Sequence, residues 1–189
     1  MSAPLIWIVF PIVIAGIMIA LSRQRRLVFF SSIFMAAFLA LLAWQLKVDE
    51  VIIVGSGAFK IQPDLSVAGR QFVILNTDRP RIMFFYSMLV FWFVGTAAMR
   101  VPRLFIPLGL LSTTVFMAAL AVEPPLFAAL LNEIAVLITV FMLITVGERI
   151  NRGLVRFLIY QTIGMLLILM AGWFLEGGQV DSGNIVGIL

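Results

Sequence analysis

The chain has 189 residues and a net charge of +4, and only 12% of its residues are charged whereas 63% are hydrophobic. Soluble domains are about 25% charged, so this composition excludes a soluble enzyme and indicates that lipid is the main solvent. The absence of Cys and His excludes disulfides, imidazole metal ligands and Ser-His-Asp or Cys-His nucleophiles, and no continuous basic face for nucleic acid is found.

Six apolar runs follow one another along the chain, and a spanning helix needs about 20 mostly apolar residues. The runs cover approximately Ala3–Ser22, Leu27–Leu46, Ile82–Met99, Leu104–Val122, Leu126–Gly147 and Leu154–Leu175. The first run is followed, not preceded, by arginines, so it is interpreted as a retained helix and not as a signal peptide. The sequence therefore predicts an all-α membrane protein in which residues 1–189 form one transmembrane domain of six helices.

Prolines mark several helix boundaries in this pattern. Pro80 follows Asp78, and Pro124 and Pro125 follow Glu123, which is the arrangement of a cap followed by a proline at a helix start. Pro11 and Pro107 fall inside runs, where membrane helices tolerate proline because neighbouring helices satisfy the freed carbonyls.

Residues 47–81 form the only long segment between the runs. The segment alternates β-branched stretches with Gly55, Gly57, Pro63-Asp64 and Gly69, which are strand and turn signals. A short β-hairpin on the outer face is predicted, and an irregular linker is the alternative.

The distribution of arginine predicts the orientation of the helices. Eight of the thirteen basic residues follow the first, third and fifth runs: Arg23, Arg25, Arg26, Arg100, Arg103, Arg149, Arg152 and Arg156. Because basic residues collect in cytoplasmic loops, both termini are expected outside the cytoplasm. Three tryptophans near run ends are expected in an aromatic belt at the membrane surface: Trp7, Trp44 and Trp173.

Glu133 is the only acidic residue inside the six runs. It lies about eight residues into the fifth run, roughly 12 Å from the helix start. A charge at that depth costs on the order of 2.5–3.5 kcal/mol, and such residues usually face a hydrated interior and often transfer protons. We therefore predict proton transfer at Glu133. The alternative is a protonated, structural Glu that hydrogen-bonds a neighbouring helix.

A few other polar residues inside the runs could line a hydrated path with Glu133: Thr113, Thr114, Gln161 and Thr162. Taken singly, each one is better explained by a hydrogen bond to its own backbone or to a neighbouring helix. Asn132 points about 100° away from Glu133 and is interpreted as a helix-packing residue. No phosphate, nucleotide or redox motif is found, so no cofactor or metal is expected.

Three consecutive segments carry a resemblance to a known family. The fourth run reads PLGLLSTTVFMAALAVEPP, the fifth LFAALLNEIAVLITVFML, and the sixth, after a basic turn, LVRFLIYQTIGMLLILMAGWF. With the outer loop, they resemble the first six helices of the antiporter-like subunits of respiratory complex I (NADH-quinone oxidoreductase), which are related to Mrp-type antiporters and membrane-bound hydrogenases. The resemblance implies that Glu133 corresponds to the family's fifth-helix glutamate, which pairs with a lysine and drives proton movement.

The sequence departs from that family after the sixth run, where family members continue with broken helices and buried lysines. No Lys lies in any run after Lys47. We therefore expect half of a split subunit, a truncated relative kept for structure, or a product whose remainder lies elsewhere in the complex, with a second chain bringing a cation to Glu133.

The leading hypothesis is a non-catalytic membrane subunit of a proton-translocating quinone oxidoreductase. It would lie in the bacterial or archaeal inner membrane, transfer protons or scaffold the membrane arm, and have lipid and other integral membrane subunits as partners. One alternative is a purely structural assembly subunit, which would depend on small helix-face residues such as Gly109 and Gly164. The other is an independent small transporter.

Overall fold

The six apolar runs form helices in the part of the chain that the computed structural model describes. Backbone is described for residues 2–54, 57–67, 69–99, 101–124, 126–143 and 152–185, with side chains for these except 51–59, 143 and 175–185. The helices are α1 (Phe10–Ala20), α2 (Arg25–Gln45), α3 (Arg79–Thr96), α4 (Phe105–Ala121), α5 (Leu126–Leu143) and α6 (Arg152–Ile185). The predicted end of the fifth run at Gly147 lies outside the described residues, as do Arg100 and Arg149.

Proline chemistry explains where two helices begin. Pro80 lies in the first turn of α3, after the short 3-10 segment η2 (Asn76–Asp78), as predicted. Pro107 is the third residue of α4, and the first four N–H groups of a helix have no intrahelical partner in any case. Pro107 therefore frees no helical carbonyl, so the expectation that a neighbouring helix compensates for it was wrong. The reason is that α4 begins at Phe105, one residue after the start of the predicted run, which leaves Pro107 in the first turn.

Pro11 is the proline whose missing N–H is replaced by a hydrogen-bond donor from a neighbouring helix. It follows the π-helical segment η1 (Leu5–Val9), and in an α-helix its missing N–H would have bonded the Trp7 carbonyl. The Tyr86 hydroxyl on α3 donates to that carbonyl at 2.7 Å, and Trp7 Nε1 donates to the Leu39 carbonyl of α2 at 3.4 Å. Both rings are fully buried. The prediction that a neighbouring helix satisfies the carbonyl freed by Pro11 is confirmed. The prediction that Trp7 lies in an aromatic belt was wrong, because its ring belongs to the core.

Two β-hairpins occupy the loop between α2 and α3. Strand β1 (Val51–Val54) pairs with β2 (Gly57–Lys60), and β3 (Asp64–Val67) pairs with β4 (Arg70–Val73), both antiparallel. The short strand β5 (Val122–Glu123) joins β4 from the turn between α4 and α5. The predicted hairpin is thus confirmed as one of two, and β5 was not predicted. The second sheet connects the loop to the start of α5.

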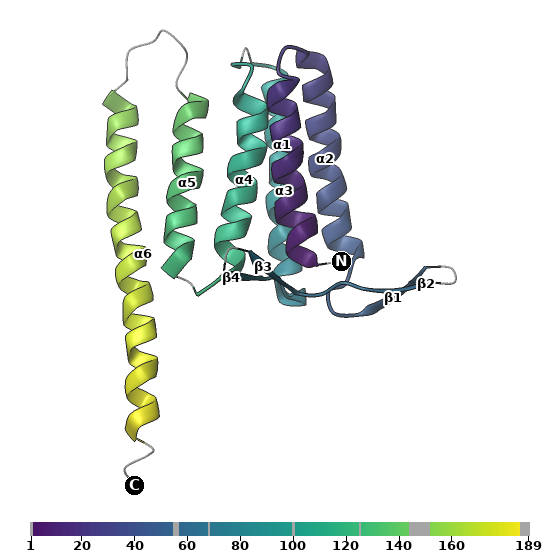
Figure 1. Ribbon diagram of the computed structural model, residues 1–189. Coiled ribbons are helices and arrows are strands. Elements are labelled where there is room, and N and C mark those ends of the chain that lie inside the picture. The colour runs from purple at the N-terminus through teal and green to yellow at the C-terminus, as the bar shows by residue number, and fades with distance from the viewer. Residues whose placement is uncertain are drawn as a thin grey trace.

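The helices form a bundle, and α6 lies at one edge of it (Figure 1). Helices α1 to α4 enclose the main core, α5 packs along α4, and α6 packs chiefly along α5 at the edge of the molecule. The largest fully buried side chains include Trp7 of η1 and, from α2, α3 and α4, Leu39, Tyr86, Leu89, Phe93 and Leu110. In the described part of the chain α6 therefore has α5 as its chief neighbour, and it extends past the level of the sheet (Figure 1).

Large apolar side chains cover the outside of the helices. Phe34 on α2 is 70% exposed and Trp173 on α6 is 68% exposed. The most apolar stretch of α6 contains no buried residue. Contiguous exposed apolar surface of this extent marks contact with a membrane or with another protein.

The lengths of the helices support the six-span prediction only in its coarser form, a mostly helical, apolar molecule. Within the described residues, two segments are long and apolar enough to cross a membrane, Arg25–Gln45 and Arg152–Phe174. The segments Leu5–Ala20, Phe105–Ala121 and Leu126–Met142 are apolar but shorter. A helix of 17 residues such as α4 is about 26 Å long, against a hydrocarbon core of about 30 Å.

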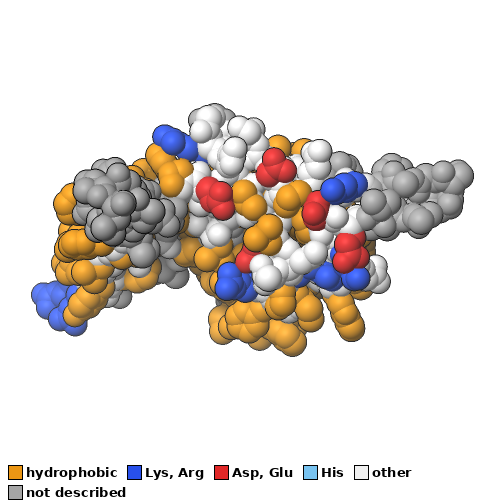
Figure 2. Space-filling view, turned by 90° about the horizontal axis from the view of Figure 1, so that it is seen from below, with side chains coloured by type: hydrophobic (Ala, Val, Ile, Leu, Met, Phe, Trp, Pro, Cys, Tyr) orange, Lys and Arg blue, Asp and Glu red, His pale blue; other side chains and the backbone are white. Residues whose placement is uncertain are grey.

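Charges differ between the two ends of the bundle. The end without the sheets carries, among the described residues, only basic side chains: Arg23, Arg25, Arg26, Arg103, Arg152 and Arg156. The sheet end mixes acidic and basic side chains (Figure 2), with ion pairs Lys47–Glu50, Lys60–Asp49 and Arg81–Asp78 at 2.9–3.0 Å. The N-terminus lies at the sheet end, where the Ala3 N–H donates to the Gln62 carbonyl at 2.8 Å.

Candidate functional site

Glu133 lies in the second turn of α5 and is the residue with the least satisfied side chain. The residue is partly buried. Its Oε2 atom is buried, and it is the buried side-chain oxygen or nitrogen that lacks a hydrogen-bond partner in the described part of the chain. Buried polar atoms are nearly always hydrogen-bonded in proteins, so an exception requires an explanation such as a missing partner or a catalytic role.

The direction of Glu133 follows from helix periodicity. Residues seven apart on an α-helix lie about 20° apart around its axis, so Glu133 shares a face with Leu126. Leu126 contacts α6, because a methyl group added at Gly172 would lie 3.7 Å from Leu126 Cδ1. Glu133 therefore lies on the α6 side of α5, toward the edge of the bundle.

A cation does not accompany this carboxyl group within the described residues. The described ion pairs all lie at the sheet end. In the described part of the chain there is also no group of three or more Asp, Glu, His or Cys side chains that could hold a metal ion.

A groove of about 460 Å³ runs between α3, α4, α5 and α6. Its wall combines large apolar side chains, among them Trp92 and Phe157, with a polar stripe: Ser112, Thr113, Asn132, Thr139 and Gln161. The Ser112 and Thr139 hydroxyls lie 3.0 Å apart and link α4 to α5. Hydroxyl and amide groups around a space of this size can hold ordered water.

The predicted path residues divide into two sets. Thr113 and Gln161 line the groove. Thr114 is fully buried and donates to the Leu110 carbonyl at 2.7 Å. Thr162 is exposed and donates to the Leu158 carbonyl at 2.9 Å. Thr114 and Thr162 therefore bond their own helices and lie outside the groove, and Glu133 is not part of the groove wall either.

Asn132 is the residue whose place the sequence interpretation missed. It lies on the groove with Thr139, seven residues later on the same helix face. That i, i+7 pair of polar residues was a readable signal in the sequence. Asn132 and Glu133 thus place two polar side chains at the same level of α5, one toward the groove and one toward α6.

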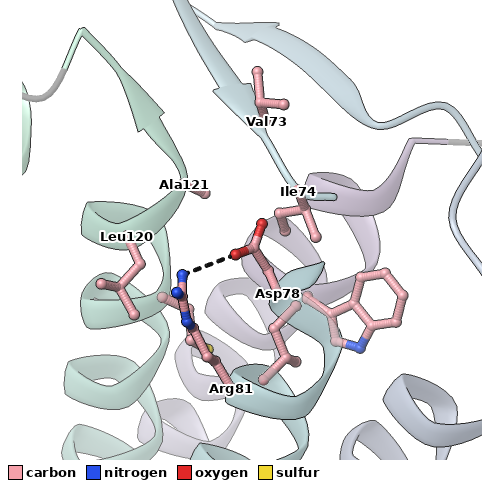
Figure 3. A pocket seen from close by; sticks show the side chains of 9 residues that line it. Val73, Ile74, Asp78, Arg81, Leu120 and Ala121 are labelled. Atoms are coloured by element: carbon pink, nitrogen blue, oxygen red, sulfur yellow. Dashed lines mark hydrogen bonds and ion pairs between the residues drawn. The ribbon is translucent and has the colours of Figure 1, made fainter. Parts of the chain in front are cut away.

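A second, small pocket lies at the sheet end between α3, α4 and β4 (Figure 3). Its volume of about 20 Å³ is enough for one water molecule. The Arg81–Asp78 ion pair crosses its wall at 3.0 Å. The ion pair stabilises the start of α3. The pocket itself is too small for a substrate.

Comparisons with known proteins give no identification. No family model matches the chain, and neither a curated protein nor a solved structure matches it. A functional conclusion therefore depends on Glu133, the groove and the surface of the bundle.

Proposed function

We propose that the chain is an integral membrane subunit of a larger proton-translocating assembly, and that Glu133 takes up and releases a proton inside the helix layer. The observation that carries this proposal is the buried, unpartnered Oε2 atom of Glu133 in a helix that has no other charged residue. An ionised carboxylate without a partner is costly in hydrocarbon, whereas a protonated one is tolerated. A change of environment can then load or unload the proton.

In this proposal all six helices cross the bilayer, with both termini outside the cytoplasm. The exposed apolar surface and the basic end support this arrangement, because basic residues stay on the cytoplasmic side. Helices shorter than the hydrocarbon core are accommodated by local thinning of the bilayer and by flanking charged residues. Arg23 after α1 and Arg103 before α4 flank two of the shorter helices and are suited to that role.

The groove gives the proton a route. Asn132, Thr113 and Gln161 on its wall can hold a chain of water beside α5. A shift in packing between α5 and α6 would bring the Glu133 carboxyl into contact with this water. Because α6 has α5 as its chief neighbour, such a shift disturbs few other contacts.

The assembly that fits best is a quinone oxidoreductase like respiratory complex I. Support comes from the resemblance of the fourth to sixth helices to the antiporter-like subunits, and from the apolar outer face of α6, which suits a neighbouring membrane subunit. That neighbour would bring the cation that Glu133 lacks among the described residues.

Replacement of Glu133 by Gln in the purified, reconstituted complex tests the proposal. Gln keeps the size and hydrogen-bonding capacity of the side chain but cannot release a proton. We expect proton translocation to fall while the complex still assembles. The matched control is Glu123→Gln, because Glu123 lies exposed on β5. Unchanged translocation by a fully assembled Glu133→Gln complex would remove the proton-handling role.

A structural assembly subunit is the second candidate, and the exposed face of α6 favours it. A methyl group added at Gly164 would meet no atom within 4 Å, whereas one at Gly109 would lie 3.4 Å from Phe93. Gly164→Ala therefore probes a partner and not the chain's own packing. Loss of assembly in Gly164→Ala, together with full activity in Glu133→Gln, would favour the structural role.

A further inference from the structure

A shallow hollow of about 300 Å³ lies at the basic end of the bundle, where the start of α2, the end of α3 and the start of α4 meet. Arg25 and Arg26 form one side of it. The rest of its wall is almost entirely apolar: Phe29, Phe30, Ala97, Val101 and Ile106. Two guanidinium groups above an apolar floor are complementary to a molecule with an anionic head and a hydrocarbon tail.

The two arginines are available for such a molecule. In the described part of the chain neither takes part in an ion pair, and α2 has no acidic residue in its first turn. Three basic side chains of the sheet end differ, since Lys47, Lys60 and Arg81 are each paired with a carboxylate. The guanidinium group also matches a phosphate in shape, because it forms two parallel hydrogen bonds to its oxygens.

Two aromatic rings of α2 form part of the floor of the hollow. Phe29 and Phe30 meet edge to face with ring centroids 5.4 Å apart, and Phe30 is 68% exposed. Thr96, the polar residue below the arginines, is buried and donates its hydroxyl to the Phe93 carbonyl at 2.6 Å. The floor therefore offers an acyl chain an apolar surface without unsatisfied polar groups.

From this arrangement we infer that the hollow formed by Arg25, Arg26 and the floor around Phe29 is a binding site for an anionic phospholipid of the cytoplasmic leaflet. Basic pockets at helix ends on that side bind anionic headgroups. The site rests on the membrane location proposed above, but it is independent of proton transfer at Glu133. A bound lipid would fill the space between the first turn of α2 and the α3–α4 turn.

The test measures retained lipid by native mass spectrometry after reconstitution in equal mixtures of phosphatidylglycerol and phosphatidylcholine. The wild type should retain phosphatidylglycerol preferentially. The double variant Arg25→Gln/Arg26→Gln should lose roughly 10-fold or more of that preference, because each basic residue near the surface contributes about a factor of five. The matched control is Arg23→Gln, since Arg23 lies in the turn just before α2 but not on the hollow. It removes one basic residue from the same membrane surface, so it should lower the preference by at most about fivefold, and by less than Arg25→Gln or Arg26→Gln alone.

Two competition measurements distinguish binding of the intact lipid from binding of its headgroup alone. Inorganic phosphate and glycerophosphoglycerol, which lack acyl chains, should compete only weakly, because the apolar floor contributes nothing to them. Equal preference in the wild type and the double variant would overturn the site, as would competition by phosphate alone at the affinity of the lipid. Insertion of the wild type and of the double variant into the bilayer is measured in the same samples. If both insert but show the same lipid preference, the lipid site is wrong; if the wild type does not insert, the membrane location is wrong.

Discussion

Replacement of Tyr86 by Phe removes one oxygen atom from the centre of the bundle. The Tyr86 hydroxyl donates to the Trp7 carbonyl at 2.7 Å, and Pro11 cannot supply the N–H that would replace it. The variant leaves a buried carbonyl of η1 without this donor. Because Tyr86 and Trp7 are both fully buried, water cannot take the place of the hydroxyl without moving two rings.

The size of the effect follows from the number of hydrogen bonds lost. One buried hydrogen bond contributes about 0.5–1.5 kcal/mol, and hydrogen bonds between membrane helices average about 0.6 kcal/mol. We therefore expect Tyr86→Phe to lower the free energy of unfolding by about 1 kcal/mol. In a chain of this size that corresponds to a decrease in Tm of about 2–4 °C.

Thermal unfolding of the detergent-solubilised protein measures this decrease. The chain contains two tyrosines, and Tyr160 on α6 is 74% exposed, so Tyr160→Phe is a matched control that should leave Tm unchanged. A Tm for Tyr86→Phe equal to that of Tyr160→Phe would show that the carbonyl next to Pro11 does not depend on α3, and the account of this proline would be refuted.

Two further predictions concern the outer loop and the orientation. Asn76 accepts the Val48 N–H at 2.8 Å and donates to the Val48 carbonyl at 2.7 Å, so Asn76→Ala should lower stability by about 1–3 kcal/mol; denaturant unfolding would measure this, and an unchanged midpoint would contradict it. Because the chain has no cysteine, Gln24→Cys and Ser66→Cys each introduce a single thiol at an exposed position on opposite ends. An impermeant maleimide added to intact cells should label Ser66→Cys only, and labelling of both would contradict the proposed orientation.

The helices were predictable because their cause is local. Six apolar runs separated by Arg, Pro and Gly clusters define where helices lie, and each run contains a helix in the structure. The ends of the helices were less predictable, because they depend on which residue begins the first helical turn. Pro107 belongs to such a turn, although the apolar pattern alone places it inside the helix.

Features made by residues far apart in the chain could not be read from the sequence. Strand β5 has two residues and exists because the turn after α4 reaches β4. The Tyr86–Trp7 contact joins residues 79 positions apart. The polar groove combines four helices, so its membership depends on packing, and Thr114 and Thr162 lie outside it although their residue type fits.

The choice of Glu133 as the candidate functional residue was possible from the sequence, because a carboxyl group in an apolar run is unfavourable wherever the helix packs. The surroundings of Glu133 were not predictable, because the face that it occupies depends on how α6 sits against α5. The structure adds the buried, unpartnered oxygen, which a sequence cannot supply.

Infrared difference spectroscopy of the protein in lipid membranes tests most directly whether Glu133 exchanges a proton. The account predicts a carboxylic acid carbonyl band that grows as the external pH is lowered, shifts in D2O, and is absent from Glu133→Gln but present in Glu123→Gln. A spectrum in which Glu133→Gln keeps the whole pH-dependent band, or in which no band changes with pH, would contradict proton exchange at Glu133.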